Sequence, residues 1–126
     1  MKIEVSNAEI LDKFSILMIK GFRIEDEDKI RNIQKEIDVL LPIADELTEE
    51  EEVYSKYLEL ISVNEELWEI EDEIREYEKR QHFEGRFIQL ARLVYITNDR
   101  RAEIKKEINL LTGSNLIEEK SYKEYK

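Results

Sequence analysis

The chain has 126 residues and a net charge of −11, with 31 Asp and Glu against 20 Lys and Arg. It has no Cys, which excludes disulfide bonds and thiolate metal sites, and a single His, which argues against a histidine metal site or a Ser-His-Asp triad. The negative charge argues against binding to nucleic acid or to an anionic membrane surface.

The first predicted helix covers residues 7–24. Ser6 followed by Glu9 has the spacing of a capping box, in which two side chains bind the free N–H groups at a helix start. Apolar residues then recur on more than one face of this segment. We therefore expect the helix to lie centrally, with neighbours on several sides.

The second predicted helix covers residues 26–41. The acidic run Glu25–Asp28 favours a helix start, because negative charge is stabilising at a helix N-terminus. A single apolar stripe follows. Pro42 has no N–H to donate to the carbonyl of Asp38, so we expect the helix to end or kink there.

Two long helices follow, over residues 49–80 and 84–112. Thr48 and Glu51 have the spacing of a second capping box. The segment Gln81–Gly85 offers the turn between the two helices, and Gly113 is a good C-terminal stop.

The predicted fold is all-α: a long antiparallel helical hairpin packed by two shorter helices. We expect one domain over residues 1–126, with residues 116–126 as a C-terminal tail. No segment has the roughly 20 apolar residues of a membrane span, and the start lacks the pattern of a signal peptide. We therefore expect a cytoplasmic protein with no membrane partner.

Polar side chains interrupt the apolar faces of the two long helices. At 100° per residue, Asn64 and Glu71 fall inside the apolar arc of the third helix. Trp68 and Arg75 lie at the edge of that arc. On the fourth helix the inner face continues through four polar residues: Asn98, Arg101, Lys105 and Asn109. A hairpin that turns near residue 82 places Asn64 opposite Arg101, so the polar positions of both helices meet in one region.

Two interpretations of this polar region stay open. In the first, a buried Glu71–Arg101 or Glu71–Arg75 network fixes the register of the hairpin, as polar seam residues do in coiled coils. In the second, the region holds more donors than one carboxylate can satisfy, which favours a pocket for an anion. The residues expected to line this pocket are Asn64, Trp68, Glu71, Arg75, Asn98, Arg101 and Lys105, with Lys13 and Lys20 from the first helix.

The acidic third helix invites a magnesium interpretation. Glu69 and Asp72 have the Glu-x-x-Asp spacing with which helical phosphohydrolases hold Mg²⁺. The fourth helix offers only Glu103 and Glu107, four residues apart, and most acids of the third helix point outward. A solvated acidic face is the better account, so we predict no metal site and reserve Mg²⁺ for an enzymatic alternative.

Four segments together resemble an uncharacterised family of short all-helical proteins from bacteria and phages: Val5–Lys20, Asn64–Glu78, Phe87–Asn109 and Leu116–Tyr122. The family has a domain-of-unknown-function label, so the resemblance implies a helical fold but no established reaction. Its members look like companions of cell-surface glycan and glycosyltransferase genes. Ala8 and Met18 depart from the family pattern, so nothing is carried over at the start of the first helix. The matching positions include Asp12, Lys13, Lys20, Asn64, Trp68, Glu71, Asp72, Arg75, Arg92, Asn98, Asp99, Arg101 and Lys105.

Three functions follow as hypotheses. The leading one is a small protein that binds a nucleotide or sugar phosphate in the inter-helix pocket and so sequesters or regulates it. The alternatives are a protein-interaction or scaffold module with a structural polar seam, and a Mg²⁺-dependent nucleoside triphosphate pyrophosphohydrolase. We favour binding over catalysis, assign no catalytic residues, and predict no cofactor other than Mg²⁺ under the enzymatic alternative. Leu58 and Ile61 extend the apolar surface of the third helix, which predicts a homodimer or higher homo-oligomer.

Overall fold

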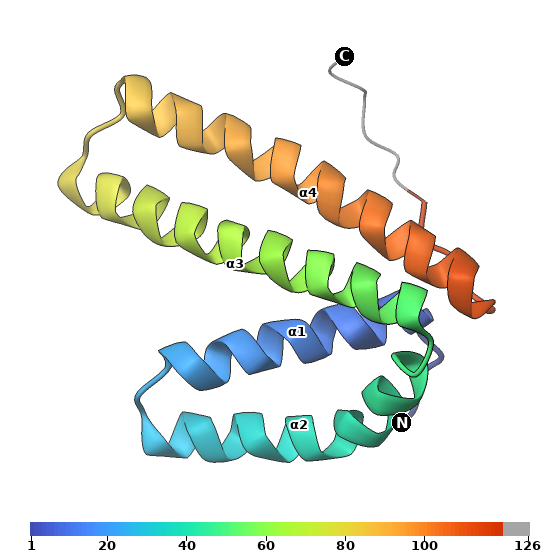
Figure 1. Ribbon diagram of the computed structural model, residues 1–126. Coiled ribbons are helices and arrows are strands. Elements are labelled where there is room, and N and C mark those ends of the chain that lie inside the picture. Colours follow the sequence, from blue (N-terminus) through green and yellow to red (C-terminus); the bar gives the residue numbers. More distant parts are fainter. Residues whose placement is uncertain (120–126) are drawn as a thin grey trace.

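The computed structural model describes residues 1–119, which fold into four helices: α1 (Asn7–Arg23), α2 (Glu27–Leu47), α3 (Glu51–Arg80) and α4 (Gly85–Thr112). They form two antiparallel hairpins, α1 with α2 and α3 with α4 (Figure 1). Helix α1 packs against each of the other three. The predicted all-α arrangement and the central place of the first helix are therefore confirmed. Of the predicted tail, residues 120–126 lie outside the described residues.

Helix α1 begins as its sequence predicts. The Ser6 hydroxyl oxygen accepts a hydrogen bond from the backbone N–H of Glu9 at 3.2 Å. The carboxylate of Glu9 accepts from Lys105 of α4 instead of reaching back to the cap. Helix α1 buries the polar residues Asp12 and Ser15 along with its apolar ones, as expected for a helix enclosed on several sides.

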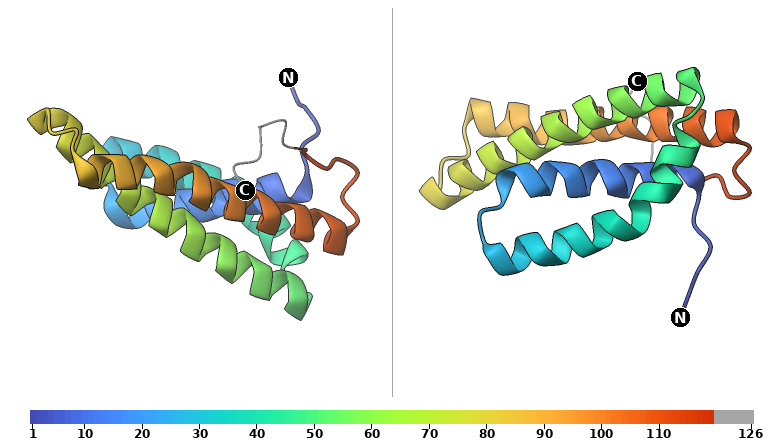
Figure 2. Two further views of the ribbon diagram at one scale, coloured as in Figure 1. Left: turned by 90° about the horizontal axis from the view of Figure 1, so that it is seen from above. Right: turned by 60° about the horizontal axis from the view of Figure 1, so that its bottom comes forward.

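Helix α2 continues through Pro42 to Leu47, so of the two outcomes expected at the proline the structure has the kink, and the boundary at residue 41 moves to residue 47. Proline removes one backbone donor and crowds the preceding turn, which bends a helix as readily as it ends one. Figure 2 shows the last turns of α2 leaving the direction of the rest of the helix. Ala44 lies in these turns and is only 3% exposed, because the bent end packs into the core.

The predicted capping box at the start of α3 is wrong. The Thr48 hydroxyl donates to the backbone carbonyl of Ala44 at 2.8 Å, so it closes the end of α2. Helix α3 begins at Glu51 without a side-chain hydrogen bond at its cap. A Thr hydroxyl that finds a carbonyl four residues back is no longer free to cap the next helix.

The two long helices end as predicted. Gln81 follows α3 in the left-handed conformation, with φ 57°, and turns the chain toward α4. Gly113 follows α4 with φ 62°, a conformation that favours glycine.

Ion pairs across the α3–α4 hairpin confirm its antiparallel register. They join Lys56 to Glu107 at 2.6 Å, Glu66 to Arg100 at 3.0 Å and Glu73 to Arg86 at 2.8 Å. None of the helices in residues 1–119 is long and apolar enough to cross a membrane.

The apolar core lies where α1 meets the other three helices. Its buried members are Ala8, Leu11, Phe14, Ala44, Val53, Tyr57, Leu60, Val63, Ile104 and Ile108. The opposite end of the α3–α4 hairpin extends past the end of α1 (Figures 1 and 2). We call this part, residues 70–96, the overhang. Leu90 is its single buried residue.

Candidate functional site

A buried carboxylate, that of Asp12, organises the polar region predicted between the helices. Asp12 is 1% exposed and faces α3 and α4 from the middle of α1. Its Oδ1 accepts from Asn64 Nδ2 at 2.9 Å and from Arg101 Nε at 3.1 Å. Its Oδ2 accepts from Arg101 Nη2, and Lys105 Nζ lies 3.6 Å from the same oxygen. One carboxylate thus joins three helices.

Neighbouring side chains complete this network. Asn64 Nδ2 also donates to Ser15 Oγ at 2.7 Å, and the Ser15 hydroxyl donates to the backbone carbonyl of Asp12 at 2.7 Å. Arg101 Nη1 donates weakly to Asn98 Oδ1 at 3.4 Å. Among the described residues, no buried side-chain nitrogen or oxygen lacks a hydrogen-bond partner. The network therefore meets the requirement that buried polar groups be paired.

Lys105 carries the network toward the surface. Its Nζ donates to Glu9 Oε2 at 2.7 Å and lies 3.6 Å from Glu118 Oε2 of the segment after α4. Burial lowers the pKa of Lys105 and of Arg101, but the hydrogen bonds that they donate to Glu9 and Asp12 and the surrounding negative charge outweigh it. Both pKa values are therefore raised, and both side chains stay cationic at neutral pH. Three carboxylates here face two cations.

Helices α1 and α4 are also joined one turn beyond Lys105. The side-chain oxygen of Asn109, on α4, accepts from the backbone N–H of Ala8 at 2.8 Å and so satisfies a free donor at the start of α1. Asn7 donates its backbone N–H to Ser114 Oγ and its side-chain amide to Thr112 Oγ1, each at 3.0 Å. The start of α1 is thus capped by the end of α4.

The predicted site residues divide into two groups. Asn64, Arg101 and Lys105 meet at Asp12, and Asn98 joins the network through Arg101. Trp68, Glu71, Arg75, Lys13 and Lys20 lie outside this network. Trp68 is half-buried under Arg23, whose guanidinium is 5.9 Å from the centre of the indole ring. Lys13 is exposed and pairs with Glu36 of α2 at 3.7 Å, and Lys20 is half-buried.

Glu71 and Arg75 are exposed on the overhang, so the predicted Glu71–Arg101 network is wrong. Asp12 takes the place that the sequence interpretation gave to Glu71, because α1 covers the polar face of α3 at Asn64 and ends before Glu71. The residue reasoning missed Asp12, which entered only through the family resemblance. Asp12 and Ser15 are three residues apart on a helix that is apolar on several faces. This pair of polar residues was the sequence signal that could have identified Asp12.

The acids considered for magnesium do not gather into a metal-binding cluster among the described residues. Glu69 forms an ion pair with Arg23, and Asp72 is exposed on α3. Glu103 and Glu107 line a shallow groove of about 250 Å³ between α3 and α4, together with Lys56, Glu59, Ser62, Arg100 and Ile104. Within residues 1–119 no three Asp, Glu or His side chains are grouped so as to hold a metal ion.

Comparison with known proteins gives a family but no further relative. No curated protein and no solved structure matches the chain. A family model described as a family of unknown function (DUF6165) matches residues 1–125. The match covers the Asp12 network, the overhang and the short helical architecture that carried the resemblance. The chain therefore belongs to this DUF6165 family of unknown function.

Proposed function

We propose that this protein acts as a helical interaction module, which binds another polypeptide through the overhang. The observation that carries the proposal is the mismatch in helix length. Helices α3 and α4 have 30 and 28 residues, whereas α1 has 17. At 1.5 Å per residue they are about 45, 42 and 26 Å long, so roughly 16 Å or more of the hairpin has no α1 beside it.

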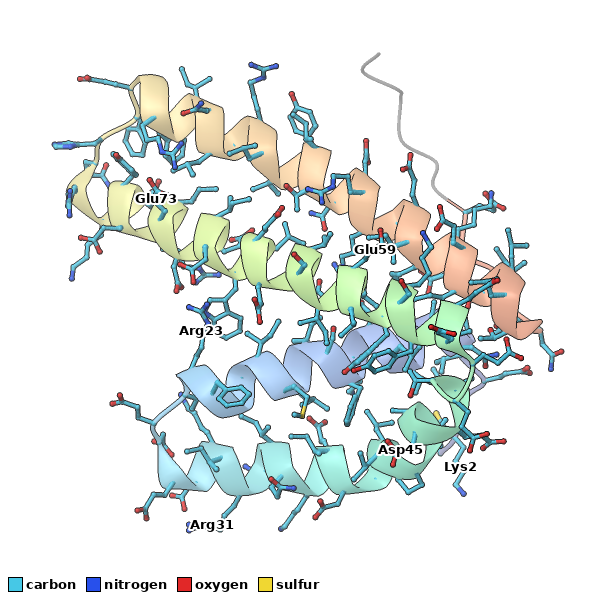
Figure 3. All side chains as sticks on the ribbon, in the orientation of Figure 1. Lys2, Arg23, Arg31, Asp45, Glu59 and Glu73 are labelled. Atoms are coloured by element: carbon cyan, nitrogen blue, oxygen red, sulfur yellow. The ribbon has the colours of Figure 1, made fainter. Side chains whose placement is uncertain are left out.

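The contacts of Arg23 mark the point at which α1 stops covering α3. Arg23 is the last residue of α1, and Figure 3 shows it reaching from the end of that helix toward α3. It stacks over Trp68 and pairs with Glu69. The helical spacing of Asn64, which faces α1, brings Arg75 onto the same side of α3 three turns later. The face that α1 covers at Asn64 therefore continues uncovered along the overhang.

This uncovered face carries apolar groups from both helices. Ile74 of α3 and Phe87 and Val94 of α4 are each only half-buried, and Ala91 of α4 is exposed. Ile88 and Tyr95 add exposed apolar area at its edge. An apolar strip flanked by charges of both signs suits an amphipathic helical partner, because helices bury such strips against each other.

Site-specific photo-crosslinking tests the proposal in cells that produce the protein. A photoreactive residue at Ala91 should give one discrete crosslinked product, mapped to a helix of the partner. The matched control is the same residue at Lys35, which is exposed on α2. A Val94→Glu change should abolish the product. Equal crosslinking from Ala91 and Lys35, or a product that survives Val94→Glu, would contradict the proposal.

A second candidate function is the binding of a small anion, such as a nucleotide or sugar phosphate, at Arg101 and Lys105. One observation favours it: a carboxylate already lies over Lys105 from outside the helices. Glu118 is 3.6 Å from Lys105 Nζ, and its side chain is 61% exposed. An anion that displaced Glu118 would gain a charge-assisted hydrogen bond in a partly buried setting.

Thermal-shift titration with nucleotides and sugar phosphates tests this second function. If an anion competes with Glu118, Glu118→Gln should strengthen its binding and Lys105→Met should abolish it. Glu119→Gln is the matched control, since Glu119 pairs with the exposed Lys106. The absence of any shift at millimolar ligand, in both the natural chain and Glu118→Gln, would contradict it.

A further inference from the structure

We propose that the partner of the overhang is a second copy of this chain, which packs its own overhang against the first around a two-fold axis. The inference rests on the proposed function and names its partner. Two features support it: the apolar side chains that the overhang leaves without a cover and the charge pattern of the uncovered face.

The overhang leaves apolar side chains without a cover. Ile88 is 57% exposed and Tyr95 is 43% exposed, beside the half-buried Ile74, Phe87 and Val94. Contiguous exposed apolar groups of this kind usually mark a contact surface.

The charges on the uncovered face are complementary to themselves. Glu71 and Arg75 are exposed, one turn apart on α3, on either side of Ile74 in the sequence. Neither side chain forms an ion pair or a hydrogen bond with any residue of the described chain. Glu73, which faces α4, is in contrast already paired with Arg86.

A two-fold axis would use both charges at once. When two copies of α3 cross antiparallel near residue 73, Glu71 of each copy lies opposite Arg75 of the other. Such reciprocal pairing is the signature of an isologous interface, in which residue i meets residue j and j meets i. The half-buried Ile74, Phe87 and Val94 lie beside these charges on the same uncovered side, where a partner removes them from water. The predicted Leu58–Ile61 surface plays no part in this arrangement.

Sedimentation analysis of the purified full chain tests the proposal. Over a dilution series from high micromolar to nanomolar, the natural chain should reach twice the 15.2 kDa of one chain. Glu71→Arg places two Arg side chains opposite each other, and Arg75→Glu places two Glu side chains opposite each other. Each change should raise the Kd of the dimer more than about tenfold, because like charges at an interface repel.

Mixing the two variants shows whether Glu71 and Arg75 pair between two copies of the chain or within one copy. The Glu71→Arg chain and the Arg75→Glu chain each repel their own copies, but each complements the other at both positions. Native mass spectrometry of the mixture, at a concentration where neither variant dimerises with itself, should therefore show a heterodimer. The double variant, Glu71→Arg with Arg75→Glu in one chain, should dimerise like the natural chain.

Controls keep each outcome interpretable. Glu65→Arg and Lys35→Glu change exposed charges away from the uncovered face and should leave the Kd unchanged. Circular dichroism should show that every variant is as helical as the natural chain. A natural chain that is monomeric at all concentrations would overturn this inference, and so would a dimer that is indifferent to Glu71→Arg and Arg75→Glu. If Ala91 still crosslinks to a different protein, the proposed function survives and only the second copy is excluded.

Discussion

Arg101 of α4 and Asp12 of α1 form a two-point ion pair although 89 positions separate them in the sequence. The Asp12 side chain is 1% exposed, whereas that of Arg101 is 26% exposed. The carboxylate therefore depends on its protein partners for the polar contacts that water would otherwise provide. Because Asn64 donates to the same carboxylate, the pair also fixes α3 against both helices.

Replacing Asp12 by Asn should strongly destabilise the fold. The change leaves Arg101 and Lys105 partly buried without their shared counter-charge, and removing one member of a buried pair costs about 3–5 kcal/mol. The free energy of unfolding, measured in urea, should fall by about that amount. Asp72→Asn, on the exposed face of α3, is the matched control and should change it by less than about 0.5 kcal/mol. A loss below about 1 kcal/mol for Asp12→Asn would show that the network is incidental to stability.

Replacing Asn109 by Ala should destabilise the start of α1. Asn109 is 2% exposed and accepts from the backbone N–H of Ala8, which would then be buried without a partner. An unsatisfied buried donor costs about 1–3 kcal/mol. Asn32→Ala, at an exposed position of α2, should be nearly neutral. Hydrogen exchange at the Ala8 amide should also accelerate in Asn109→Ala, and unchanged protection there would contradict the proposed role.

Most of the fold could be predicted from local sequence signals. The cap at Ser6, the turn at Gln81 and the stop at Gly113 act within a few residues, and all three appear where expected. Thr48 and Pro42 show that a local signal can have more than one structural outcome: the cap expected at Thr48 does not form, and of the end or kink expected at Pro42 the kink occurs. The Thr48 hydroxyl donates to the Ala44 carbonyl instead of capping α3. Helix α2 bends at Pro42 and continues, because the residues after the proline bury apolar surface.

The polar network could be predicted only in part. The periodicity of α3 and α4 brought Asn64 and Arg101 to one level of the hairpin, and both contact Asp12. Which carboxylate they would meet depended on where α1 crosses the hairpin and where it ends, and periodicity within α3 says nothing of either. The first predicted helix is shorter than the third and the fourth, and this difference in length is what leaves Glu71 and Arg75 uncovered.

Two glycines on the same chain should respond in opposite ways to alanine. Gly113 has φ 62°, a conformation that costs an L-residue about 1–2 kcal/mol, so Gly113→Ala should destabilise by about that amount. Gly21 lies inside α1, and a Cβ there would meet open space. Gly21→Ala should therefore stabilise by up to about 1 kcal/mol through helix propensity. Thermal and urea unfolding check both signs, and a stabilising Gly113→Ala would contradict the assigned end of α4.

Alkaline pH should destabilise the protein through Tyr57. Burial in the core, aided by the negative charge of ionised Tyr54, raises the pKa of Tyr57 from 10.0 to about 12. A group whose pKa is higher in the folded state stabilises that state below its unfolded pKa, and this contribution is lost as the pH rises through the folded pKa. Stability should thus fall between pH 10 and pH 12, by up to about 2–3 kcal/mol from this residue.

Tyr57→Phe keeps the ring in the core but removes the ionisable hydroxyl. Its urea-unfolding free energy should lose less between pH 10 and pH 12 than that of the natural chain. Lys105, whose pKa is also raised, should contribute its own decline above pH 10.5 in both proteins. Tyr54→Phe is the matched control, because Tyr54 is 50% exposed and should leave most of the decline intact. An identical loss of stability in Tyr57→Phe and the natural chain would place the alkaline transition elsewhere in the molecule.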